Sequence, residues 1–144
     1  MNTDPYHLKR FLDAQADCIE QVEEELRNGR KQSHWMWFIF PQIKGLGSSA
    51  MANRYGISSR KESQAFLLHK ILGLRLRHCT SLVLRIEGKS VEQIFGNPDD
   101  VKFRSCMTLF ANVDSENSPF SEALQKYFGG KPDPLTIDLL NQER

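Results

Sequence analysis

Along most of the chain, hydrophobic residues recur every three or four positions with charged residues between them, which is the spacing of amphipathic helices. The first such run follows Asp4-Pro5, where an N-cap side chain precedes proline at the first helical position. It ends at Asn28-Gly29, because glycine takes the left-handed conformation that closes a helix. The stripe that would face the core is formed by Leu8, Phe11, Leu12, Gln15, Ile19, Val22 and Leu26. The spacing therefore predicts one long amphipathic helix.

Local start and stop signals place the remaining helices. Ser59 and Glu62 have the spacing of a capping box, and prolines 98, 119 and 134 each follow a turn-forming residue. Helices are predicted over residues 34–40, 48–55, 59–87 with a break near Gly73, 91–95, 98–110, 119–128 and 134–141. No segment alternates apolar and polar residues as a half-buried strand does. The predicted fold class is all-α, a compact multi-helical single domain over residues 1–144 with about seven or eight helices around a buried aromatic helix.

The most apolar stretch covers residues 34–41 (HWMWFIFP) and holds both tryptophans and two of the nine phenylalanines. Such a stretch is stable in water only when the rest of the fold covers it. It is too short to span a bilayer, which needs roughly 20 apolar residues. Periodicity alone does not separate a buried helix from a buried strand here, but the neighbouring segments are helical and a lone strand has no partner. We expect a short helix with Trp35 and Phe38 largely buried.

Composition narrows the class of protein further. The formal net charge of +1 gives no bulk attraction to nucleic acid or to an anionic membrane. Residues 1–5 lack the basic region and apolar run of a secretory signal. Cys18, Cys79 and Cys106 are widely spaced and suggest neither a disulfide framework nor a zinc site. We expect a cytoplasmic protein with reduced, mostly buried cysteines, no metal, no cofactor, no nucleic-acid or membrane partner, and an oligomeric state left open.

The best candidate site lies where the aromatic stretch meets the glycine-rich turn that follows it. Aromatic rings there could stack on a planar ligand, a lysine could bind phosphate or carboxylate, and the glycines would let backbone N–H groups approach an anion. The candidate ligand-binding residues are Lys31, Trp35, Gln42, Gly45, Gly47 and Tyr55. His34 is a candidate catalytic residue because imidazole exchanges protons near neutral pH. The alternative is structural: a core of aromatics, a helix-terminal histidine and a turn.

A second candidate group is the segment Asp99-Asp100-Val101-Lys102. Asp100 could orient a base or bind a ribose hydroxyl, which makes it the second candidate catalytic residue, and Lys102 could bind an anionic ligand. Paired acids in the first turn of a helix are favoured by the helix dipole alone, so the structural role is the first interpretation and the functional role is the alternative.

Motifs over nearly the whole chain resemble the family catalogued as domain of unknown function 1810, sometimes labelled calpastatin-like. They are Arg10-Phe11-x-x-Ala14-Gln15, Gly29-x-Lys31-x-Ser33 continuing through residue 42, Gly45-Leu46-Gly47-x-Ser49, Leu72-Gly73-x-Arg75-Leu76, Ile94-Phe95-Gly96, Asp99-Asp100-x-Lys102 and Ser105-x-Met107-Thr108-Leu109-Phe110. Departures are Lys70-Ile71, where the family often has His-Pro, and Cys106, where serine is commoner. The resemblance implies a compact multi-helical domain and no particular activity. More distantly, the order of motifs is similar to an all-α family that processes NAD-derived and ADP-ribose-type compounds.

Two functions from different classes follow from these observations. The first is a site for a small anionic ligand, phosphorylated or nucleotide-like (of the NAD or ADP-ribose type), with or without enzymatic chemistry. The second is a non-enzymatic protein-interaction domain whose aromatic stretch is purely core. The two differ in one structural expectation: the first requires the candidate residues to converge on a pocket.

Overall fold

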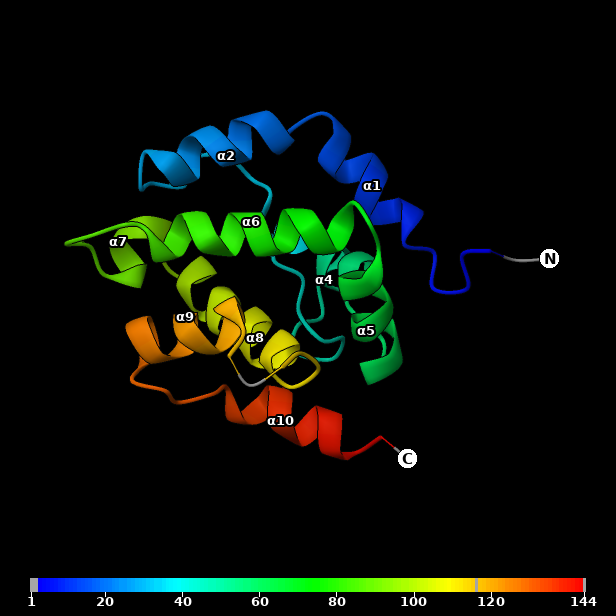
Figure 1. Ribbon diagram of the computed structural model, residues 1–144. Coiled ribbons are helices and arrows are strands. Elements are labelled where there is room, and N and C mark those ends of the chain that lie inside the picture. The colour runs from blue at the N-terminus through cyan, green and yellow to red at the C-terminus, as the bar shows by residue number, and fades with distance from the viewer. Residues whose placement is uncertain (1–2, 116, 144) are drawn as a thin grey trace.

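Ten α-helices form one all-α domain in the parts of the chain, residues 3–115 and 117–143, that the computed structural model describes (Figure 1). The helices are α1 (Lys9–Ala16), α2 (Ile19–Arg27), α3 (Met36–Ile39), α4 (Ala50–Tyr55), α5 (Arg60–Leu68), α6 (Leu72–Leu84), α7 (Val91–Phe95), α8 (Asp99–Ala111), α9 (Pro119–Phe128) and α10 (Pro134–Asn141). These residues contain no β-strand, and an isolated parallel bridge joins Ile43 to Ile57. The predicted all-α class is confirmed, with ten helices in place of seven or eight.

The predicted first helix is in fact two helices, α1 and α2. The Asp4 carboxylate accepts hydrogen bonds from the backbone N–H groups of Leu8 (2.7 Å) and Lys9 (3.0 Å), so it caps a helix that begins later than Pro5. At Cys18 the backbone φ of −131° leaves the helical region, and the chain bends before α2 begins. Gly29, with a φ of +74°, closes α2 as predicted.

Helix α6 crosses the middle of the molecule, with α1 and α2 on one side and α8 and α9 on the other (Figure 1). The break predicted near Gly73 lies where α5 turns into α6. A Cβ atom at this position would lie 2.0 Å from the carbonyl oxygen of Leu67, so only glycine allows the two helices to approach this closely.

Side-chain caps open α7, α9 and α10, whereas α8 begins one residue after the predicted Pro98 and has no side-chain cap. Ser90 and Gln93 form a complete capping box at α7, and Ser118 and Asp133 cap α9 and α10 ahead of their prolines. Ser59 accepts the backbone N–H of Glu62 as predicted, but the Glu62 side chain does not return to Ser59. The predicted box at α5 is therefore only half formed.

The aromatic stretch forms the centre of the core. Trp35 and Phe38 are only 1% and 9% exposed, which confirms their predicted burial. Phe40 packs edge to face against Phe95 and Phe103, with ring centroids 5.9 and 5.1 Å apart. The helix within the stretch, α3, is a single turn and not the seven-residue helix expected.

A buried carboxylate fixes the approach to this stretch. Glu25 accepts hydrogen bonds from the backbone N–H groups of Gln32 and Ser33, from the Ser33 hydroxyl and from the Trp35 indole N–H. Burial alone would raise the pKa of Glu25, but the hydrogen bonds from Ser33, Gln32 and Gln21 outweigh it and lower the pKa to about 2. The ionised carboxylate therefore holds the Trp35 indole through a hydrogen bond, and within the described residues it makes no ion pair of its own.

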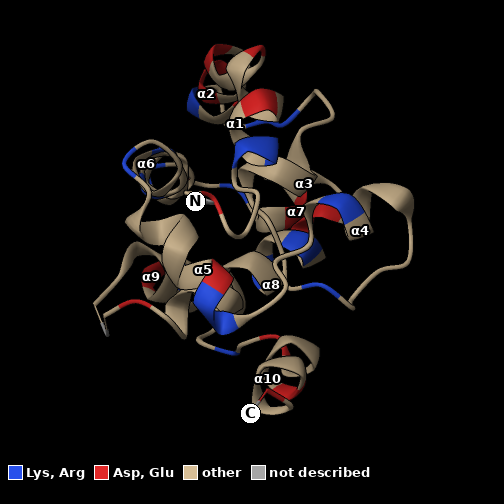
Figure 2. Cartoon of the chain, turned by 90° about the vertical axis from the view of Figure 1, so that its right-hand side faces the viewer, with Lys and Arg blue, Asp and Glu red and all other residues tan. Residues whose placement is uncertain are grey.

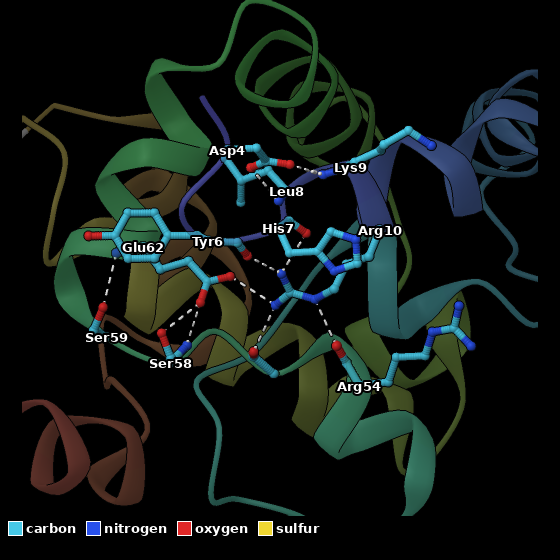
Figure 3. Close-up of polar contacts among 11 residues, drawn as sticks. Asp4, Tyr6, His7, Leu8, Lys9, Arg10, Arg54, Ser58, Ser59 and Glu62 are labelled. Carbon is cyan, nitrogen blue, oxygen red and sulfur yellow. Dashed lines mark hydrogen bonds and ion pairs between the residues drawn. The ribbon is translucent and has the colours of Figure 1, made fainter. Parts of the chain in front are cut away.

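A second buried carboxylate ties the N-terminal region to α4 and α5 (Figure 3). The Arg10 guanidinium lies 2.8 Å from Glu62 and also donates to the carbonyl oxygens of Arg54 and Gly56. Glu62 completes its hydrogen bonds with the backbone N–H and hydroxyl of Ser58. Because Arg10 binds the carbonyls on both sides of Tyr55, it fixes that residue at the end of α4.

Candidate functional site

A cavity of about 480 Å³ opens between α3, the loop over residues 42–49, α4, the first turns of α8 and the start of α10. Figure 2 shows α3, α4 and α8 grouped above α10 on this side of the molecule. The volume lies within the range of roughly 300–1,000 Å³ that is usual for small-molecule sites. Apolar side chains and a few polar groups share its wall.

Trp37 brings the aromatic stretch to this cavity. Trp35 precedes α3 and is buried, whereas Trp37 lies within α3. Trp37 is half-buried and lines the cavity, and the Lys102 ammonium lies 4.7 Å from its ring centroid. The cavity therefore contains an indole and a cation in contact.

Lys102 makes only a long ion pair with Asp99. Its Nζ lies 3.6 Å from one oxygen of Asp99, whereas the Lys31 Nζ lies 2.8 Å from the other oxygen. The Lys31 side chain is 7% exposed and the Lys102 side chain 25% exposed. Two cations thus share one carboxylate, and the surplus positive charge is on the lysine that lines the cavity.

The rim of the cavity on the loop side presents polar groups without partners. Gln42 and Tyr55 both line the cavity, and within the described residues neither side chain makes a hydrogen bond. Every fully buried polar side-chain atom in the same residues has a partner, so the Gln42 amide and the Tyr55 hydroxyl are open to solvent. The Tyr55 ring itself packs against Phe11 and Phe38, which leaves only its polar edge for a ligand.

The opposite side of the cavity is formed where α8 meets α10. One oxygen of Asp133 accepts hydrogen bonds from the Ser105 hydroxyl (3.0 Å) and from the backbone and hydroxyl of Thr136. Its other oxygen makes no hydrogen bond within the described residues. Ser105 follows Lys102 by three residues, so the two residues lie about one helical turn apart along α8.

The family described as "Protein of unknown function (DUF1810)" matches residues 5–140. The chain belongs to this family. Among solved structures it is similar to the conserved hypothetical protein Rv1873 from Mycobacterium tuberculosis, with 55% identity and a TM-score of 0.95 over 97% of this chain and 100% of that one. No curated protein matches the sequence. The resemblance read from the motifs is therefore confirmed, and it assigns no activity.

The residues predicted from the sequence do not all converge on the cavity. Those that line it are Gln42, Gly47, Tyr55 and Lys102, whereas His34, Asp100, Lys31, Trp35 and Gly45 lie outside its wall. His34 is exposed, and Asp100 bonds to the Asn97 amide and to the backbone of its own helix. Gly45 has a φ of +108°, which suits the turn but places no N–H at the cavity.

Two expected roles need correction. Trp35 is buried and donates its indole N–H to Glu25, so it has no free face on which a ligand could stack. Lys31 is not the exposed charge expected at a helix end, because its ammonium bonds to Asp99 and to the Ser33 carbonyl. Its ammonium is therefore held inside the fold and does not line the cavity.

Sequence reasoning missed Trp37, Ser105 and Asp133 as cavity residues. The signal for Trp37 was present, since its position two residues after Trp35 places it on the opposite side of a helix. Asp133 was recognised only as a cap for α10. Its meeting with Ser105 depends on how α10 packs on α8, which no local pattern encodes.

The cysteines lie apart from the cavity. Cys79 and Cys106 are buried as predicted, whereas Cys18 is half-buried. Burial raises the pKa of all three thiols, that of Cys79 to about 12. Within the described residues, no three His, Cys, Asp or Glu side chains are grouped to hold a metal ion, and no helix is long and apolar enough to cross a membrane.

Proposed function

We propose that the cavity between α3, α4, α8 and α10 binds a small molecule that combines a planar ring with an anionic group, such as a phosphorylated, nucleotide-like compound. The observation that carries the proposal is the meeting of Trp37 and Lys102 in one cavity, with the ammonium 4.7 Å from the indole ring. A ring would take the place of the ammonium over the indole, and the ammonium would turn to the anionic group. Separating the ammonium from the indole costs only about 0.5–1 kcal/mol, the usual strength of a cation–π interaction at an exposed site.

The remaining polar groups fit the other parts of such a ligand. The oxygen of Asp133 that makes no internal hydrogen bond belongs to the carboxylate bound by Ser105, one helical turn after Lys102 on α8, and could accept a ligand hydroxyl. In this proposal Asp133, and not Asp100, binds the ligand hydroxyl. The opposite charges at the two positions favour a ligand with an anion at one end and hydroxyl donors at the other.

The proposal is binding, without a reaction. His34 and Asp100, the two candidates for proton transfer, lie outside the cavity wall. Ser105 already donates its hydroxyl to Asp133 or to the carbonyl of Val101. The cavity residues therefore support recognition of a ligand, and they assign no step of bond making or breaking.

The test is isothermal titration calorimetry with the four nucleoside 5′-monophosphates, ribose 5-phosphate and phenyl phosphate. The wild-type protein should bind at least one of them, and Lys102→Gln should weaken that affinity by about 10-fold or more, as expected for loss of a charged hydrogen bond. Lys70→Gln changes an exposed lysine outside the cavity and should leave the affinity unchanged.

Equal affinities of wild type and Lys102→Gln would reject this site, and so would the absence of binding to the whole panel. In that case the protein-interaction alternative is favoured. The surface to test would then be the corner between α5 and α6, where Leu68, Ile71 and Leu74 are exposed.

A further inference from the structure

We infer that Gln42 makes this cavity selective for a nucleobase over a plain aromatic ring. The inference rests on the proposed function and deepens it: Trp37 accepts the face of any ring, whereas Gln42 would read the ring's edge. The ligand class is then a nucleoside phosphate, and the determinant of specificity is the carboxamide of one residue.

Backbone hydrogen bonds to Ile57 hold the chain before and after Ile43, the partner of Ile57 in the isolated bridge, and Gln42 is the residue before Ile43. The Ile57 N–H donates to the Gln42 carbonyl at 2.8 Å, and the Lys44 N–H donates to the Ile57 carbonyl at 2.8 Å. Ile57 follows α4 closely, and its neighbour Gly56 is bound by Arg10. The loop that carries Gln42 is therefore fixed against the domain, which keeps its side chain at the cavity.

The Gln42 carboxamide is available to a ligand. The residue is half-buried in the cavity wall, and no other group in the described residues bonds to its amide. Other polar groups in the cavity wall are satisfied inside the fold: the Ser105 hydroxyl and one Asp133 oxygen bond to each other. The Gln42 amide and the Tyr55 hydroxyl line the same cavity as the Trp37 indole, and neither makes a hydrogen bond within the described residues.

A primary carboxamide places one acceptor and one donor side by side in a plane. Nucleobases carry a complementary adjacent donor and acceptor on an edge, which is why glutamine and asparagine recognise adenine through two hydrogen bonds. Because the amide can turn over, either order of donor and acceptor is matched. A plain aromatic ring would bury the amide without a partner, and a site with an unpaired polar group rejects such a ligand.

The experiment compares wild type, Gln42→Leu and Gln64→Leu in calorimetric titrations with the nucleoside 5′-monophosphates and with phenyl phosphate. Gln64 is exposed on α5 outside the cavity wall, so its replacement is the matched control. Wild type and Gln64→Leu should bind the preferred nucleotide about 10-fold or more tightly than phenyl phosphate, the size expected for two hydrogen bonds to a base edge. Gln42→Leu should reduce this preference to about 2-fold or less by weakening nucleotide binding alone. Gln42→Met, which is unbranched, serves if the leucine variant does not fold.

The outcomes separate the inference from the proposed function. Binding that depends on Lys102 but shows no preference for a nucleotide, or a preference that survives in Gln42→Leu and Gln42→Met, overturns the role of Gln42 and leaves the cavity as a site for ring-bearing anions. If no phosphate compound binds, or if binding is indifferent to Lys102, both the inference and the proposed function are wrong.

Discussion

Trp35 and Trp37 are separated by one residue and each has a lysine beside its ring, yet they differ in burial and in the polar groups around them. Trp35 is 1% exposed, and its indole N–H is bound to Glu25, whose carboxylate is surrounded by donors. Trp37 lines a cavity beside Lys102, among polar groups that lack partners. An aromatic residue whose polar neighbours are all satisfied belongs to the core. One whose polar neighbours are open is a candidate for binding.

The two lysines that share Asp99 repeat this contrast. Lys31 makes the shorter ion pair, donates to the Ser33 carbonyl and lies 5.1 Å from the Trp35 ring centroid. Lys102 makes the longer pair and lies over Trp37. One tryptophan and one lysine therefore form a structural pair, and the other tryptophan and lysine a cavity pair. Substitutions should separate the two pairs.

The largest effect is expected from Trp35→Ala. Deleting a buried aromatic side chain leaves a void and here also leaves Glu25 short of a donor, so the free energy of unfolding should fall by about 3–5 kcal/mol. Trp37→Ala should cost clearly less, because its ring is only half-buried. Urea denaturation of both variants measures the difference. Equal losses would end the distinction between the two tryptophans.

Glu25 should make the structural region sensitive to acid. Its pKa is about 2 in the folded protein against an ordinary value of 4.5, so its stabilising contribution is present above about pH 4.5 and is lost as the pH falls toward 2. Between about pH 6 and pH 3 this one group should remove about 2 kcal/mol. Glu25→Gln lacks this titration, so the stability gap between it and wild type should narrow by that amount. A gap independent of pH would contradict the assignment.

Lys31→Met and Lys102→Met form a matched pair around Asp99. Lys31→Met should lower the free energy of unfolding by about 1–3 kcal/mol, because it removes a nearly buried partner of a carboxylate. Lys102→Met should change stability by less than about 0.5 kcal/mol. Thermal unfolding followed by circular dichroism measures both. A larger loss of stability for Lys102→Met than for Lys31→Met would show that the lysine at the cavity is the one that stabilises the fold.

The smallest effect is expected for the reactivity of the three cysteine thiols, which lie apart from both tryptophans in the sequence. Cys79 and Cys106 are buried and should react with a thiol reagent only as the protein opens, whereas the half-buried Cys18 should react first. Mass spectrometry of the partially labelled protein identifies the order. Rapid labelling of Cys106 in the native protein would show that the core around α8 opens far more readily than its burial indicates.

The sequence predicts features that depend on neighbouring residues and misses those that depend on long-range packing. Caps such as Ser90 and Asp133 involve residues three positions apart, so short-range chemistry encodes them and the predicted starts of α7 and α10 are correct. Burial of Trp35 follows from apolar character alone. The bend at Cys18 could not be predicted, since neither glycine nor proline marks it, and α1 and α2 pack on different helices, α3 and α6.

The candidate site was predictable only in part. Gln42, Gly47, Tyr55 and Lys102 were identified, because loop polarity and charge near an aromatic stretch are visible in the sequence. Lys31 does not line the cavity because its ammonium forms an ion pair with Asp99, a residue 68 positions away in the sequence. Which tryptophan is buried and which lines the cavity depends on the hydrogen bonds to Glu25, and residue spacing does not predict those bonds.

The most direct test of the cavity as a binding site uses the two tryptophans as reporters. Since the sequence contains only Trp35 and Trp37, Trp37→Phe leaves the core tryptophan as the sole indole fluorophore. Titration with the nucleoside 5′-monophosphate that binds in calorimetry should quench the emission of the wild-type protein and leave that of Trp37→Phe unchanged. Equal quenching in both proteins, or no change in the wild type at saturation, would contradict a ring bound against Trp37.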